Sequence, residues 1–164
     1  MGRCRFVQPE TVRLYLVDVH RSRVRKLEEQ IAAGKATKDE VAMLPALTAN
    51  LAEAEVDGAF IDVKKELNAG EQRAVFAGMT KDVHAGDVRF ALDPAQVGLT
   101  KLVAYIVGWS FVDAAGAPVP VSEGAINGLD TETFAELIAA IDAYEDGVEK
   151  ARAMRKNVLS GATP

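Results

Sequence analysis

The chain has 164 residues, of which 49% are hydrophobic and 26% charged, and its formal net charge is −5 at pH 7. This length suits one domain with or without a small appendage, and the composition argues against a disordered chain. A single cysteine, Cys4, excludes an intramolecular disulfide and a multi-cysteine metal site. No apolar run of a signal peptide follows the N-terminus, and the apolar stretch 102–109 is far too short to span a membrane. We therefore expect a soluble, cytoplasmic protein.

Charge is distributed unevenly along the sequence. Residues 1–26 hold seven basic and two acidic residues, a net of +5, which leaves −10 for the remainder; nine acidic and no basic residues lie between Lys101 and Lys150. An acidic half disfavours a nucleic-acid backbone, because binding it requires cations on the contacting face. The basic residues at 21, 23, 25 and 26 therefore have two interpretations, a solvated helix face or a nucleic-acid contact.

Two strands are predicted near the start of the chain. Apolar and polar residues alternate over 11–19, and a second strand pattern covers 59–64 after the turn pair Asp57-Gly58. We expect these two strands to pair as a hairpin.

Between the strands, residues 20–56 predict a helical hairpin. Its first helix ends at Gly34, and Thr37 with Glu40 has the spacing of a capping box that begins the second. Pro45 lies inside this second helix, so we expect a kink or a restart there. Because its apolar stripe is thin, we expect the hairpin to project from the main body.

The rest of the chain is predicted to be mainly helical. One helix begins after Asn68 and ends at 86–87, and a second begins at Asp93-Pro94 and runs through Val107. The second is apolar almost all round, so we expect it to be central and buried. A short strand over 109–112, a turn at 113–116, an extended segment at 118–120 and a helical turn after Ser122 follow. Asp130 caps the last helix, whose apolar stripe runs from Phe134 to Ala151.

These elements predict an α+β, mostly α-helical fold. A small N-terminal β-hairpin is interrupted by the helical hairpin and followed by a three-helix body. We expect one α+β domain formed by 1–19 and 57–159, an inserted helical hairpin at 20–56 and a flexible tail at 160–164.

No residue pattern indicates a reaction centre. The two histidines, His20 and His84, belong to no H-x-x-x-H pair, and the glycine-rich phosphate-binding motifs are absent. The carboxylates of the last helix, Glu132 and Glu136 among them, are interpreted as a solvated acidic face rather than as a catalytic pair. We therefore expect a non-enzymatic protein with no catalytic residues, no cofactor and no metal.

Five segments between Phe60 and Tyr144 follow one another in a characteristic order: 60–71 (FIDVKKELNAGE), 99–102 (LTKL), 108–110 (GWS), 113–120 (DAAGAPVP) and 126–130 (INGLD). Together they resemble the small tail assembly chaperones, and neighbouring tail-module proteins, of long-tailed bacteriophages with non-contractile tails. The resemblance covers about half of the chain. It implies a protein of the host cytoplasm that binds the tape-measure and tail-tube proteins during virion morphogenesis, with no membrane partner.

The hairpin at 20–56 departs from this resemblance, which implies a short turn between the first two strands. A structural virion protein, such as a tail, head–tail connector or decoration subunit, is therefore an alternative, and a nucleic-acid-binding regulator is a second. Self-association is left open. For Trp109, core packing and anchoring of a partner are both interpretations. The residues predicted to bind protein are Trp109, Phe111, Leu44, Leu47 and Leu51.

Overall fold

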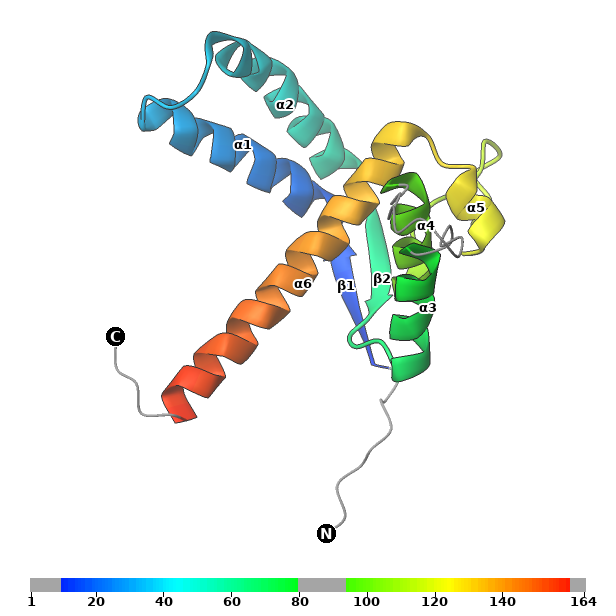
Figure 1. The fold of residues 1–164 in the computed structure, drawn as a ribbon. Helices are drawn as coiled ribbons and strands as arrows, with labels where there is room; N and C mark the ends of the chain where they lie inside the picture. Colours follow the sequence, from blue (N-terminus) through cyan, green and yellow to red (C-terminus); the bar gives the residue numbers. More distant parts are fainter. Residues whose placement is uncertain (1–9, 80–93, 160–164) are drawn as a thin grey trace, which may run out of the picture.

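The computed structural model describes residues 10–79 and 94–159. It has a small antiparallel sheet with helices packed against one of its faces (Figure 1), which confirms the predicted α+β, mostly helical class. In chain order the elements are β1 (Thr11–Tyr15), α1 (Leu16–Ala32), α2 (Lys38–Asp57), β2 (Phe60–Lys64), α3 (Ala69–Met79), α4 (Pro94–Tyr105), β3 (Ile106–Trp109), α5 (Glu123–Asn127) and α6 (Thr131–Leu159).

The sheet has the order β1-β2-β3, with both pairings antiparallel. Thr11 pairs with Lys64 and Tyr15 with Phe60, so the predicted strand hairpin is confirmed. Ile61 and Val63 of β2 are buried, and they join side chains from α1, α4, α5 and α6 in one core. The core contains Leu16, Val19, Ile61, Val63, Leu102, Ile106, Ile126, Leu137, Ala140 and Ile141.

The first strand is shorter than predicted, because α1 begins at Leu16. The alternation over 16–19 also fits a helix, in which Leu16, Val19 and His20 fall on one buried face. The N–H of Leu16 donates to the carbonyl of Ala59 at 3.0 Å, which joins the start of α1 to the start of β2. The helical hairpin therefore spans 16–57 rather than 20–56.

The third strand is displaced from its predicted position. It covers Ile106–Trp109, whereas the sequence predicted a helix through Val107 and a strand over 109–112. Ile106 and Val107 are β-branched, and pairing with β2 outweighs the helical period that these residues continue. The helix α4 is also less enclosed than predicted, since Leu102 is fully buried but Val103 is 42% exposed.

The predicted helix starts are confirmed by their hydrogen bonds. Thr37 and Glu40 form both halves of a capping box, Asn68 accepts from the N–H of Glu71 at 2.9 Å, and Asp130 accepts from the N–H of Thr133 at 2.9 Å. Helix α2 continues through Pro45 without a restart.

Several predicted features lie outside the described residues. They are Cys4, His84, the cap Asp93, the helix end at 86–87 and the tail 160–164.

Arg13 and Asp62 link β1 to β2 across the exposed side of the sheet. Both nitrogens of the fork, Nε and Nη2, donate to the carboxylate at 2.9 Å, and the guanidinium carbon lies 3.6 Å from the centre of the Phe60 ring. These hydrogen bonds lower the pKa of Asp62. The folded state therefore favours the ionised carboxylate.

Asp62→Asn is expected to destabilise the protein near about pH 7 but not near about pH 2. A carboxylate whose pKa is depressed on folding adds stability above its unfolded pKa of about 4, and this stability is lost as the pH falls through the folded value. Urea denaturation of both proteins at the two pH values measures the difference. An equal difference at both would contradict an electrostatic role for this pair.

Candidate functional site

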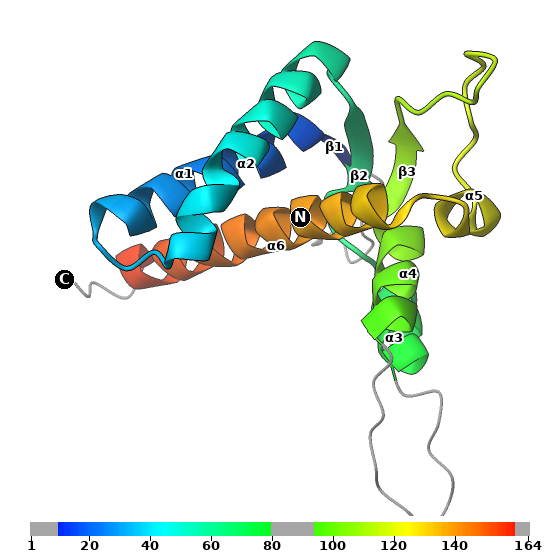
Figure 2. The ribbon, with the colours of Figure 1, turned by 90° about the horizontal axis from the view of Figure 1, so that it is seen from above.

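Helices α1 and α2 form an arm that leaves the sheet and diverges from α6 in Figure 1, whereas α6 overlaps the arm in the view of Figure 2. Helix α1 buries five residues, whereas α2, with 20 residues, buries none. The predicted protein-binding residues Leu44, Leu47 and Leu51 are half-buried on α2, which packs against α1. These three leucines therefore help to hold the arm together.

The outer surface of α2 is unusually apolar for an exposed helix. No residue from Val41 to Ala52 carries a charge. Val41 is 44%, Met43 56% and Val56 89% exposed. Both ends of the helix are charged, so the apolar exposure is confined to its middle and to Val56. The described part of the chain leaves these apolar side chains uncovered.

Trp109 and Phe111, the other predicted binding residues, lie together beyond the arm, in β3 and the segment after it. Their rings stack with centroids 5.1 Å apart, and the Trp109 Nε1–H donates to the carbonyl of Val119 at 2.6 Å. Both are half-buried against the core. The structure thus brings Trp109 and Phe111 together but leaves them apart from the leucines of α2, and the indole already packs and hydrogen-bonds within its own chain.

His20 and Glu136 form a contact between the arm and the body that the sequence analysis missed. His20 of α1 is 6% exposed, and its Nε2 lies 2.8 Å from the Glu136 Oε1 of α6. Glu136 was predicted to belong to a solvated acidic face, which is wrong, because its side chain is only 12% exposed. Helical spacing shows which residues share a face of α6 but does not reveal that α1 covers one of them.

An open hollow of about 450 Å³ borders this pair. Acidic residues dominate its lining, which includes Glu53, Asp57, Asp130, Glu132 and Glu136. The hydroxyl of Thr133, which also lines it, donates to Asp130 at 2.7 Å and is not directed at the imidazole. Among the residues that the structure describes, no group of three or more His, Cys, Asp or Glu side chains is placed to hold a metal ion.

A second polar cluster joins α4 to α6. The Tyr105 hydroxyl donates to Glu145 at 2.5 Å, and the ammonium of Lys101 contacts both Asp142 and Glu145. Burial, and then the bond to Glu145, raise the pKa of Tyr105, which keeps the phenol protonated. Asp142 and Glu145 do remain exposed, at 55% and 37%, as predicted for an acidic face, but Lys101 pairs with both carboxylates and Tyr105 also bonds Glu145.

The basic residues of α1 divide into two groups. Arg21 lies 2.8 Å from Asp18 and 3.2 Å from Glu55, and the Nε of Arg25 lies 3.8 Å from Glu29. Arg23 and Lys26, by contrast, form no ion pair within 10–79 and 94–159. The predicted cluster is therefore partly neutralised, and two of its cations remain available to a ligand.

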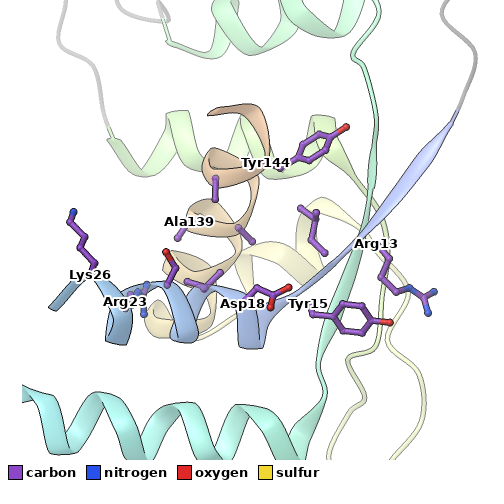
Figure 3. A pocket seen from close by; sticks show the side chains of 12 residues that line it. Arg13, Tyr15, Asp18, Arg23, Lys26, Ala139 and Tyr144 are labelled. Carbon is purple, nitrogen blue, oxygen red and sulfur yellow. The ribbon is translucent and has the colours of Figure 1, made fainter. Parts of the chain in front are cut away.

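These two cations border a groove between α1, the end of β1 and α6 (Figure 3). The groove has a volume of about 360 Å³. Three alanines of α6 form its floor, Arg23 and Lys26 come from α1, and Arg13 and Tyr15 come from β1. Its lining consists of Arg13, Leu14, Tyr15, Asp18, Val19, Ser22, Arg23, Lys26, Ala139, Ala140, Ala143 and Tyr144.

Among the described residues, no helix has both the length and the apolar character needed to cross a membrane. Comparison of this chain with protein-family models, curated proteins and solved structures finds no match.

Proposed function

We propose that this chain is a non-enzymatic adaptor, a tail assembly chaperone that binds tape-measure and tail-tube proteins in the host cytoplasm. The observation that carries the binding role is the uncharged surface of α2 on a projecting arm. The resemblance of residues 60–144 to phage tail assembly chaperones supports the choice of partners.

The packing of the body supports a role for α2 in contacts with other proteins. The core takes Leu16 and Val19 from α1 but no residue from α2. The second helix of the arm nevertheless has well-defined ends. A complete capping box begins it, and Gly58, at φ +63°, ends it. A well-formed helix outside the core, with an uncharged middle segment and exposed apolar side chains, has the properties of a surface for a protein partner.

A structural virion protein is the second candidate, and the attachment of the arm favours it. The buried contact between His20 and Glu136 fixes α1 to α6 at the base of the arm, and a fixed arm suits a permanent contact with a neighbouring subunit. Mass spectrometry of purified particles separates the two roles. A tail, connector or decoration subunit is present in constant copy number, whereas a chaperone is absent.

Val41→Glu/Met43→Glu is expected to weaken partner binding at least about tenfold without unfolding the protein. Both side chains are more than 40% exposed. Residues two positions apart lie on different sides of a helix, so a partner that covers either side buries a carboxylate without a partner, which opposes docking. The measurement is co-expression with the tape-measure and tail-tube proteins of the same phage, followed by affinity capture and by circular dichroism of the free variant.

The matched control is Val112→Glu/Met154→Glu, which also adds two carboxylates, since Val112 is 58% and Met154 68% exposed and both lie outside the arm. It is expected to leave capture unchanged. Absence of a complex with the unaltered chain at micromolar concentration would contradict the proposed function. If the arm variant captures the partners as well as the unaltered chain does, the arm is not the binding surface.

A further inference from the structure

We propose that the groove between α1 and α6 binds an acidic amphipathic segment of a partner protein. The inference rests on the proposed function, because it names the chemistry of a partner that the adaptor would hold. It concerns a surface distinct from the uncharged face of α2, and it is argued from the floor of the groove and the charges at its border.

The floor of the groove suits apolar side chains on a closely packed segment. Ala139, Ala140 and Ala143 line it from α6, and Leu14 and Val19 line it from β1 and α1. Alanines carry little beyond their Cβ atoms, so a helix can approach α6 closely at this position. The volume of about 360 Å³ lies at the lower end of the range of ligand pockets, about 300–1,000 Å³, which favours a few inserted side chains over a large ligand.

The border of the groove carries an excess of positive charge. Arg13 is engaged by Asp62, and Asp18 by Arg21. Among the described residues that line the groove, the charges of Arg23 and Lys26 are thus left without a carboxylate. These two residues are three positions apart on α1, and residues at this spacing are neighbours on a helix surface. They are therefore placed to receive carboxylates that are also one helical turn apart.

This local excess contrasts with the formal net charge of −5 for the whole chain. A cationic site on an otherwise anionic protein directs an acidic segment to that site, because the segment is attracted there and repelled by the rest of the surface. Nucleic acid fits the groove less well. Of the lining cations in the described part of the chain, two are unpaired, and the floor is apolar. Affinity for a phosphate backbone depends on many cations on one face.

The test uses a labelled helical peptide of about 18 residues, long enough to form a helix, with leucines along one face and glutamates beside them. A second peptide carries glutamine in place of every glutamate. Fluorescence anisotropy is expected to show binding of the glutamate peptide that weakens with added salt, and at least about tenfold weaker binding of the glutamine peptide. Backbone amide shifts are expected at Ala139 and Ala143.

Two variants test the groove from its two sides. Arg23→Glu/Lys26→Glu is expected to weaken binding of the glutamate peptide at least about tenfold. Ala143→Glu, at an exposed position of the floor, is expected to weaken it without altering either cation, so the test does not depend on how α1 tolerates its substitutions. The matched control, Lys35→Glu/Lys150→Glu, changes the net charge by the same amount at exposed sites outside the groove and is expected to leave binding unchanged.

Several results would overturn the proposal. Equal binding of the two peptides, no binding of either, full binding to the groove variants, or amide shifts confined to α2 would each do so. Displacement of the peptide by duplex DNA at lower concentration would assign the groove to nucleic acid, and a dimer that disappears in Arg23→Glu/Lys26→Glu would assign it to a second copy of the chain. If capture of the tape-measure or tail-tube protein depends on the arm while the glutamate peptide does not bind, the groove proposal fails and the proposed function remains.

Discussion

His20→Ala is expected to lower the free energy of unfolding by about 3 kcal/mol, because it leaves a carboxylate nearly buried and without its partner. The imidazole of His20 is 7% exposed and the side chain of Glu136 12%. Removing the ring also enlarges the hollow that His20 and the buried Leu16 line, and takes away the packing of the ring. Urea denaturation near about pH 7, followed by circular dichroism, measures the loss.

Arg21→Ala is the matched control for this substitution. Arg21 is adjacent to His20 in the sequence and also forms ion pairs, but its side chain is 56% exposed, and exposed pairs are worth about 0–1 kcal/mol. A double variant, His20→Leu/Glu136→Leu, removes both polar groups and is expected to recover most of the lost stability. A loss for His20→Ala as small as that for Arg21→Ala would contradict the role of this pair in holding the arm to the body.

Signals confined to a few neighbouring residues were sufficient to predict most of the elements. The capping boxes at Thr37 and Asn68 and the cap at Asp130 depend on groups three positions apart, so their geometry follows from the sequence. The boundaries at Leu16 and Ile106 were wrong for a physical reason. Short runs of apolar residues satisfy both the helical and the strand period, and the pairing of β2 with its neighbours decides between them.

The candidate sites could not be predicted in this way, because they form where helix faces that are far apart in the sequence pack together. His20 and Glu136 lie on different helices, and each looks like an ordinary polar residue of an amphipathic helix. The groove joins residues near the start of the chain to residues of α6. The sequence predicted that the hairpin would project, because its apolar stripe is thin, but the uncharged run of α2 was not singled out from it. It did not predict that Arg21 and Arg25 would find acidic partners while Arg23 and Lys26 would not, because helical period alone does not specify these contacts.

Leu102→Ala is expected to destabilise the protein by about 3 kcal/mol, within the range of about 2–5 kcal/mol for truncation of a buried leucine. Leu102 is fully buried on α4, and it belongs to the core that includes Ile61 of β2 and Ile141 of α6. The buried side chains of this core come from α1, β2, α4, β3, α5 and α6, which limits how far any one of them can move to fill the cavity. Chemical denaturation near about pH 7 provides the measurement.

Val103→Ala is the internal control, because Val103 is the next residue of the same helix but is 42% exposed. It is expected to cost less than about 1 kcal/mol, and Leu102→Met, which nearly conserves volume, less than about 1.5 kcal/mol. Because α2 contributes no residue to this core, the two kinds of variant are expected to differ in what they lose. Val41→Glu/Met43→Glu lowers capture of partners, and Leu102→Ala lowers the free energy of unfolding. A large loss of stability in the arm variant would mean that α2 supports the folded body, and its apolar surface would no longer be evidence for a binding role.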